Sequence, residues 1–286
     1  MRTYRIQEED LDLEETMTCG QTFCWHRVSG ELYSDGQPHF YSFRDGKPLI
    51  VEETEEGVEV RTELDREEVE RALGLHHDLE EVFSTFPEDE TLELARDELW
   101  GLRLLQDDPF ACLVSYLCSP QMQIPRIKRM HNAIADRWGE TTVIDGVEMR
   151  RFPGPSELSD ATEQELREIG VGYRAEYIER SVEKIENGFS LEETREMDYT
   201  DARDHLKQLH GVGDKVADCV LLFSLGFYEA APLDTWARKA LKVHYPGLHS
   251  ENYAEASENI RDHFGEYAGY AQEYIFHAAR TGLLEV

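Results

Sequence analysis

Cysteine is scarce in this sequence, and the five cysteines form no pattern. The 286 residues contain Cys19, Cys24, Cys112, Cys118 and Cys219. This is an odd number with no Cys-x-x-Cys pair, which disfavours a disulfide framework and indicates a reducing compartment. No apolar run reaches the roughly 18 residues that span a membrane, and the N-terminus lacks the apolar core of a signal peptide. We therefore expect a soluble protein that works in the cytoplasm.

Basic residues are few. Lys and Arg total 29 against 60 Asp and Glu, a formal net charge of −31, which excludes a generally basic nucleic-acid-binding surface. Because 40% of the residues are apolar and 10% aromatic, the chain can bury a core and is not predicted to be disordered. In molar salt the Debye length is about 3 Å, so a carboxylate-rich surface stays hydrated without strong self-repulsion. We expect a halophile-type protein that works in molar salt. The alternative is an acidic protein that works at ordinary salt concentration.

Hydropathy patterns divide the chain near residue 105. Before it, short apolar runs alternate with turn signals such as Asp45-Gly46, typical of an antiparallel sheet with few helices. After it, the apolar spacing is helical, with helix starts at Asp108-Pro109 and at residues 160–163. We predict an α+β chain, with a small N-terminal β-rich domain over residues 1–105 and an all-α domain over residues 106–286.

The sequence LKQLHGVGDKVADC at residues 206–219 carries the most informative motif. Gly211, Val212 and Gly213 permit a tight hairpin between two helices, and outward N–H groups there could bind a phosphate without positive side chains. The spacing does not fit a P-loop, because Lys215 does not directly follow the second glycine, nor a dinucleotide fingerprint, which needs a third glycine. A plain helix–helix connector is the alternative interpretation of this turn.

A lysine and a carboxylate follow the hairpin at positions suited to catalysis. Lys215 lies in the first turn of the second helix, whose positive end disfavours an ammonium, so its amine is a candidate nucleophile. Nineteen residues later, Asp234 precedes another predicted helix, where an Asp is often only an N-cap. Paired with a nucleophilic amine, it could also stabilise positive charge at a sugar carbon and handle protons.

These residues are part of a resemblance to a known protein family that covers nearly the whole chain. Residues 206–236 resemble the helix–hairpin–helix, Gly-Pro-Asp (HhH-GPD) superfamily of base-excision DNA glycosylases, and the nearest likeness is to the 8-oxoguanine DNA glycosylase/AP-lyase family. Further blocks match that family in order, at residues 11–13 (LDL) with 18–25 (TCGQTFCW), 117–126 (LCSPQMQIPR), 170–174 (GVGYR) and 267–276 (YAGYAQEYIF). The resemblance implies a monomeric bifunctional enzyme of base-excision repair whose partner is damaged double-stranded DNA.

The resemblance also implies a mechanism in which the damaged nucleotide is flipped out of the duplex. Lys215 would attack the deoxyribose C1′ and displace the oxidised base, and the resulting Schiff base would permit β-elimination 3′ to the abasic site. Asp234 would stabilise the oxocarbenium-like charge while it caps its helix.

Four residues would form the base pocket by the same resemblance. The base would lie between Cys219 and Phe276, and Gln272 would hydrogen-bond its Watson–Crick edge. The carbonyl of Gly20 would accept the N7–H that distinguishes 8-oxoguanine from guanine. Ordinary core packing is the alternative for Cys219 and Phe276, whereas Gln272 on an apolar helical face is harder to explain in that way.

Duplex contacts are implied at further positions. Tyr173 would wedge beside the flipped nucleotide, and Arg126 and Arg174 would contact the orphaned cytosine. The complete predicted DNA-binding set is Gln121, Arg126, Tyr173, Arg174, Gly211, Val212, Gly213 and Trp236. Two segments, residues 125–131 and 235–249, carry basic residues without acids and form local basic islands.

Three positions depart from the family's usual residues. Gln121 stands where Asn is common. This change affects how the gap left by the flipped nucleotide is filled, and it affects the preference for an opposite cytosine. Trp236 stands where His follows the catalytic Asp, so stacking or packing would replace a phosphate contact. Cys24 stands where Arg is common, which removes one positive charge.

We expect no required cofactor. No Cys follows Cys219, which excludes the four-Cys iron–sulfur loop of the endonuclease III and adenine-mismatch branches, and the histidines show no metal-ligand spacing. A monovalent cation at the hairpin is compatible with the sequence. The alternative functions are excision of oxidised pyrimidines and non-catalytic DNA binding; retention of both Lys215 and Asp234 argues against the second.

Overall fold

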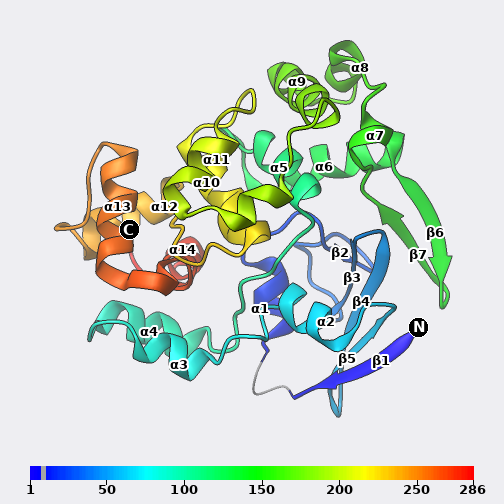
Figure 1. Cartoon of the computed structure of the whole chain (residues 1–286). Helices are drawn as coiled ribbons and strands as arrows, with labels where there is room; N and C mark the ends of the chain where they lie inside the picture. The colour runs from blue at the N-terminus through cyan, green and yellow to red at the C-terminus, as the bar shows by residue number, and fades with distance from the viewer. Residues whose placement is uncertain (8–10) are drawn as a thin grey trace.

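The structure, a computed structural model, describes residues 1–7 and 11–286, and Figure 1 shows a β-sheet at one end of the molecule with helices over the rest. The strands are β1 (Arg2–Ile6), β2 (His26–Arg27), β3 (His39–Arg44), β4 (Lys47–Thr54), β5 (Gly57–Thr62), β6 (Glu140–Ile144) and β7 (Val147–Arg151). The α-helices are α1 (Leu13–Thr18), α2 (Arg66–Ala72), α3 (Leu79–Ser84), α4 (Glu90–Glu98), α5 (Pro109–Leu117), α6 (Ile124–Trp138), α7 (Pro155–Leu158), α8 (Glu163–Glu168), α9 (Ala175–Glu186), α10 (Tyr199–Leu206), α11 (Asp214–Val220), α12 (Thr235–His244), α13 (Tyr253–Phe264) and α14 (Ala268–Thr281). Shorter helical segments are η2 (Gly172–Arg174), η3 (Glu192–Glu196), η4 (Leu221–Leu225) and η5 (Gly265–Tyr267).

The N-terminal strands form the predicted antiparallel sheet, in the order β1-β5-β4-β3-β2. Asp45 and Gly46 connect β3 to β4 with φ values of 50° and 71°, the left-handed conformations that a tight hairpin turn requires. In the middle of the sheet, Val51 pairs with Phe40 on one side and Val60 on the other. All three side chains are fully buried, so the hydrophobic pattern determines the register.

The chain after residue 106 is mostly helical, which confirms the α+β class, but it contains one hairpin that the all-α prediction lacked. Strands β6 and β7 pair through an Asp-Gly turn at residues 145–146. Val147 and Met149 of this hairpin pack with Tyr41 and Ile50 of the large sheet. The hairpin forms because it covers apolar side chains on a sheet face that would otherwise meet solvent.

Two predicted helix starts had different outcomes. Asp108 caps α5 and Pro109 is its first residue, as predicted. The start predicted at Asp160 is wrong, because α8 begins after Thr162. The Thr162 side chain accepts from the Glu165 N–H, and the Glu165 side chain accepts in return from the Thr162 N–H. This reciprocal capping box satisfies two otherwise unpaired N–H groups.

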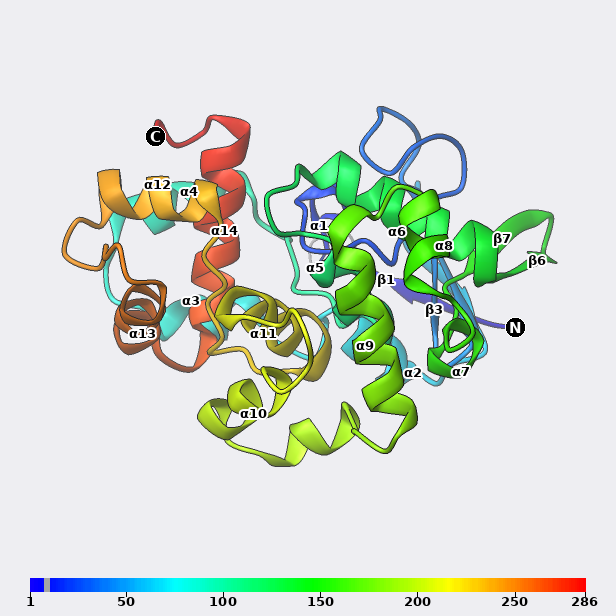
Figure 2. The same ribbon diagram turned by 90° about the horizontal axis from the view of Figure 1, so that it is seen from above.

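Helix α14 joins both parts of the molecule. It packs against α4, α12 and α13, and Figure 2 shows it beside α12 and α13 in the left half of the view. Tyr274 of α14 is fully buried and donates a hydrogen bond to the Leu102 carbonyl at 2.9 Å. Leu79 and Leu92, from the helices after the sheet, belong to the same apolar core as Tyr274. The larger core therefore draws residues from both sides of residue 105, and it fixes α14 against them.

Two glycines test how closely the end of α2 packs against the segment at Leu104. Gly74 and Gly188 each follow a helix C-cap with a positive φ, 71° and 101°, so alanine costs about 1–2 kcal/mol of strain at either site. A methyl group at Gly74 would also lie 2.4 Å from the Leu104 carbonyl oxygen, whereas one at Gly188 meets nothing within 4 Å. We expect Gly74→Ala to lower the free energy of unfolding by about 2 kcal/mol more than Gly188→Ala, measured by denaturant titration. Equal losses would contradict this packing argument.

Candidate active site

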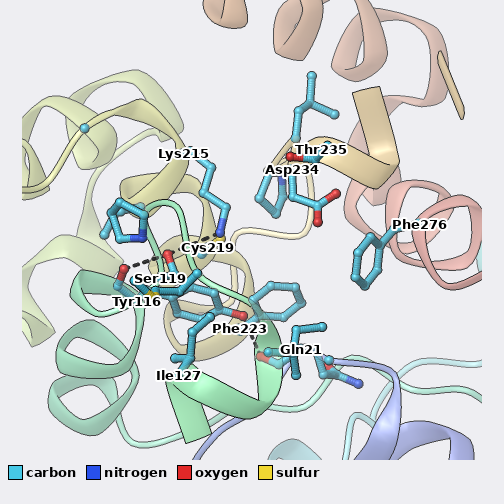
Figure 3. A pocket seen from close by; sticks show the side chains of 18 of the residues that line it. Gln21, Tyr116, Ser119, Ile127, Lys215, Cys219, Phe223, Asp234, Thr235 and Phe276 are labelled. Atoms are coloured by element: carbon cyan, nitrogen blue, oxygen red, sulfur yellow. Dashed lines mark hydrogen bonds between the residues drawn. The ribbon is translucent and has the colours of Figure 1, made fainter. Parts of the chain in front are cut away.

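One cavity gathers most of the predicted site residues. It has a volume of about 770 Å³ and lies between the segment at Gly20, the α5–α6 junction, α11, the start of α12, and α14. The predicted residues that line it are Gly20, Gln121, Gly211, Gly213, Lys215, Cys219, Asp234, Gln272 and Phe276. Figure 3 shows Lys215, Asp234 and Phe276 projecting toward it from three separate elements.

Lys215 is the second residue of α11, and neutral groups orient its amine. Its Nζ lies 3.5 Å from the Ser119 Oγ and 5.0 Å from the centre of the Tyr116 ring. The Tyr116 hydroxyl donates to the Gln21 carbonyl at 2.6 Å, and its ring stacks on Phe223. No carboxylate of the described residues forms a salt bridge with this amine. The amine is therefore directed into the cavity without being tied to a counter-ion.

Asp234 is the N-cap of α12, as predicted. Its Oδ1 accepts from the N–H groups of Trp236 and Ala237 at 2.8 and 2.9 Å. Burial raises the pKa of the Asp234 carboxyl, while these N–H groups and the charge of Lys215 act in the opposite direction. The described residues supply no hydrogen bond to Oδ2. The cap therefore uses one oxygen and leaves the second available toward the cavity.

The four predicted base-pocket residues lie together around the cavity. Gly20 has a φ of 109°, and a methyl group there would lie 2.6 Å from the Ile124 Cδ1 and 3.6 Å from the Phe276 Cε1. Burial raises the pKa of the Cys219 thiol to about 12, so this thiol is a neutral packing surface. Gln272 is buried, and its Oε1 has no partner among the described residues. The pocket therefore offers two apolar walls and polar groups without protein partners.

A buried charged cluster ties α14 to the segment that leads into Gly20. His277 Nε2 lies 2.5 Å from the Glu15 Oε2, and this hydrogen bond lowers the pKa of Glu15. Arg280 donates to the Thr18 carbonyl at 3.0 Å. These residues are 262 positions apart in the chain, so spacing arguments could not find the cluster. It positions the Gly20 carbonyl relative to the base-pocket residues of α14.

Lys128 supports the same segment from α6. Its Nζ donates to the carbonyls of Phe23 and Trp25, each at 2.7 Å, and burial lowers its pKa to about 7. Its inclusion in the basic island at residues 125–131 is therefore wrong, because the side chain is buried. Its charge acts on the neighbouring Cys24 thiol, so a cation from another element lies beside the position where the family commonly carries Arg.

The hairpin of residues 211–213 has the predicted shape, but fewer of its N–H groups than predicted are available to bind a phosphate. Gly211 has a φ of 85°, and a methyl group there would lie 2.3 Å from the Tyr177 ring. The N–H of Val212 donates to the Leu209 carbonyl at 3.2 Å, so it is not available for a phosphate. Gly213 is exposed and has open space around its Cα. The surface at Gly213 therefore allows close approach of a backbone ligand.

Predicted duplex-contacting side chains outside the cavity differ in exposure. Tyr173 and Trp236 are 43% and 37% exposed, and Arg126 is also exposed. The Lys239 Nζ lies 4.6 Å from the centre of the Trp236 ring. An exposed aromatic ring beside a cation is suited to stacking on a nucleic acid.

Arg174 is placed differently from the expectation of an exposed contact. It is 2% exposed, lies over the Tyr173 ring, and donates to the Pro120 carbonyl. The next residue, Gln121, is exposed with a φ of 58°, a conformation that side chains other than glycine rarely adopt. In this structure Arg174 therefore supports the segment that carries Gln121, and its contact with cytosine stays a prediction.

The cavity residues that were not predicted as functional include Tyr116, Ser119 and Glu273. Ser119 and Glu273 lie inside the matched blocks at residues 117–126 and 267–276, which was a usable signal. Tyr116 follows no pattern that separates it from the core residues of a helix. The placement of Tyr116 depends on neighbours that are distant in sequence.

Three further observations concern the cysteines, metal-binding groups and membrane-spanning helices. The five cysteines are buried and free, as predicted. Within residues 1–7 and 11–286, no group of three or more His, Cys, Asp or Glu is arranged to hold a metal ion. Over the same described ranges, no helix combines the length and the apolar character needed to cross a membrane.

Comparisons with known proteins agree with this architecture. Residues 3–113 match the family model of the 8-oxoguanine DNA glycosylase N-terminal domain, and residues 114–265 match that of the HhH-GPD superfamily base excision DNA repair proteins. A probable N-glycosylase/DNA lyase of Methanothermobacter thermautotrophicus is 35% identical, over 98% of this chain and 97% of its own. The N-glycosylase/DNA lyase OGG1 of Arabidopsis thaliana is 33% identical, over 95% and 78%.

A solved structure is similar over its full length. The 8-oxoguanine glycosylase/lyase of Clostridium acetobutylicum, in complex with double-stranded DNA containing cytosine opposite 8-oxoguanine, superposes with a TM-score of 0.85 at 29% identity. The match covers 99% of each chain. The fold and the site thus define a member of the HhH-GPD superfamily of base-excision repair proteins. Within that superfamily, the chain belongs to the 8-oxoguanine DNA glycosylase family.

The buried amine of Lys128 predicts a pH-dependent stability. Its pKa falls from 10.5 to about 7 on folding, so between these values the unfolded chain holds a proton that the folded chain has lost. Its contribution to stability therefore rises with pH from about 7 to 10. The gap in unfolding free energy between wild type and Lys128→Met should widen by roughly 1 kcal/mol per pH unit. Chemical denaturation at several pH values measures it; the exposed neighbour, as Arg129→Met, should show a constant gap.

Proposed function

We propose that this protein is a bifunctional DNA glycosylase and AP lyase that excises 8-oxoguanine from double-stranded DNA. The observation that carries the proposal is the convergence of the Lys215 amine and the Asp234 carboxyl on one cavity whose walls hold unpartnered polar groups. The names of the relatives, which include 8-oxoguanine glycosylase/lyase and N-glycosylase/DNA lyase, support the same chemistry.

The chemistry follows from an amine nucleophile. The Lys215 amine, oriented by Ser119, forms a bond to C1′ of the flipped nucleotide as the bond from C1′ to N9 breaks and the base leaves with the electron pair. The negative charge of Asp234 stabilises the positive charge that develops on the sugar. Loss of a proton from the amine and opening of the sugar give a Schiff base. Removal of a C2′ proton then expels the 3′ phosphate.

Selection of the damaged base rests on Gly20. Its carbonyl accepts the N7–H of 8-oxoguanine, which guanine lacks, while Cys219 and Phe276 enclose the ring and Gln272 reads the Watson–Crick edge. A hydrogen bond whose absence leaves a buried group unpaired is worth about 1–3 kcal/mol, about one to two orders of magnitude in affinity. The hydrogen bond between Glu15 and His277 holds the Gly20 carbonyl in a fixed position.

Duplex binding would combine wedging and stacking with a few charges. Tyr173 enters beside the flipped nucleotide, Gln121 and Arg126 face the orphaned cytosine, and Trp236 with Lys239 stacks against the strand. These contacts suit a protein of net charge −31 working in high salt, because stacking is not screened. A monomer acting in the cytoplasm, the division of domains at residue 105, and a monovalent cation at the hairpin stay predictions.

Borohydride trapping tests the nucleophile. Wild type should form a covalent adduct with a duplex that contains 8-oxoguanine, most strongly opposite cytosine, and Lys215→Gln should form none. Asp234→Asn keeps a good N-cap and should lower the single-turnover rate by about 10²–10⁴-fold. Lys47→Gln, at a half-buried lysine of the sheet far from the cavity residues in sequence, is the matched control. An adduct formed only on oxidised pyrimidines would overturn the assigned base, and DNA binding without any adduct would favour a non-catalytic role.

Salt dependence tests the mode of duplex binding. A basic protein that neutralises six to ten phosphates has a slope of log K against log salt of about −5 to −9; we expect a slope shallower than about −4 here. Trp236→Ala should weaken binding by a similar factor at every potassium chloride concentration, because stacking is not screened. Lys242→Gln should weaken it mainly at low salt. Fluorescence anisotropy with labelled duplex measures both, and a slope as steep as that of a basic protein would contradict the proposal.

A further inference from the structure

A buried carboxyl in the cavity wall has no role in the mechanism above. Glu273 follows Gln272 on α14, is 2% exposed and lines the cavity. Its Oε1 is buried and has no hydrogen-bond partner among the described residues. Burying a polar atom without a partner is costly, so this oxygen is suited to a partner that arrives with the substrate.

The hydrogen bonds that nearby donors make do not reach the Glu273 Oε1. Arg280 donates to the Thr18 carbonyl and lies 3.0 Å from the His277 Nδ1. The Gln21 amide donates to the carbonyls of Thr16 and Arg103. The described residues form no salt bridge with Glu273. The Cys19 thiol interacts with this carboxyl, but structural pairing leaves its Oε1 without a partner among the described residues.

The surroundings keep the group protonated. Burial raises the pKa of Glu273 to about 8; the charge of Asp234 acts in the same direction, while the Cys19 thiol and the charges of Arg280 and Lys215 oppose it. At neutral pH the side chain is a carboxylic acid, which can donate a hydrogen bond. Its neighbour Cys19 directly precedes Gly20, so the acid lies on the side of the cavity where that carbonyl is held.

We propose that Glu273 is a base-binding residue whose carboxylic acid donates a hydrogen bond to a carbonyl oxygen beside N7 of the extruded 8-oxopurine. The inference rests on the proposed function and deepens it. An oxidised purine presents an N–H at N7 next to a C=O at C8, whereas guanine presents a bare nitrogen next to a C–H. An acceptor at Gly20 and a donor at Glu273 together match the oxidised edge and mismatch the normal one.

Two DNA substrates distinguish an effect on base recognition from an effect on the rest of catalysis. One duplex carries 8-oxoguanine opposite cytosine, and the other carries a preformed abasic site, which needs Lys215 but has no base to read. We expect Glu273→Ala to lower the single-turnover rate of 8-oxoguanine excision at least tenfold and to leave abasic-site cleavage within about twofold. Glu273→Gln, which retains a neutral donor, should restore most of the excision rate. Glu266→Gln, at an exposed glutamate just before α14, is the matched control.

A pH series supplies a second readout. The wild-type acid ionises near pH 8 and the glutamine does not, so the ratio of wild-type to Glu273→Gln excision rates should fall as pH rises from about 7 to 9. Equal loss on both substrates, no loss on either, or a ratio independent of pH would overturn the role of Glu273. Failure of wild type to excise 8-oxoguanine while it still cleaves the abasic site would instead overturn the proposed function.

Discussion

The contact of α14 with the segment before Gly20 is the constraint on which the rest of the site depends. A duplex-binding face alone could be built from the helices after residue 106, but a pocket that reads one base needs groups from both ends of the chain. The Glu15–His277 hydrogen bond and the Arg280 bond to the Thr18 carbonyl supply that connection. Lys128 secures the same segment from α6.

The proposed DNA-binding site carries little positive charge, although DNA is a polyanion. Lys215 is oriented by a hydroxyl and an aromatic face, and the pocket walls are a neutral thiol and a phenyl ring. Two exposed aromatic side chains, Tyr173 and Trp236, lie outside the cavity. This arrangement is consistent with a net charge of −31, because hydrogen bonds, stacking and shape retain their strength where long-range attraction is screened.

Much of the fold and of the catalytic pair could be predicted because the signals are local. The Asp45-Gly46 turn, the Asp108-Pro109 helix start, Lys215 after the hairpin and Asp234 as an N-cap each depend on neighbours within a few positions. Other features depend on distant partners. The β6–β7 hairpin exists because it covers the sheet, Arg174 is buried by the Pro120 carbonyl, and Lys128 is buried by carbonyls about a hundred residues away; no local pattern contains that information.

The sequence by itself determined the class of fold, the helix that Asp234 caps, and the choice of Lys215 and of the four predicted base-pocket residues, whose roles are those proposed above, since motif spacing and side-chain chemistry suffice for these. Only the tertiary structure decided which polar groups are satisfied. It shows that the Val212 N–H is already used, that burial keeps the Cys219 thiol neutral, and that the Glu273 Oε1 is buried without a partner among the residues that the structure describes. Burial and hydrogen bonding are properties of the space around a side chain, and that space is assembled from segments that the linear order keeps apart.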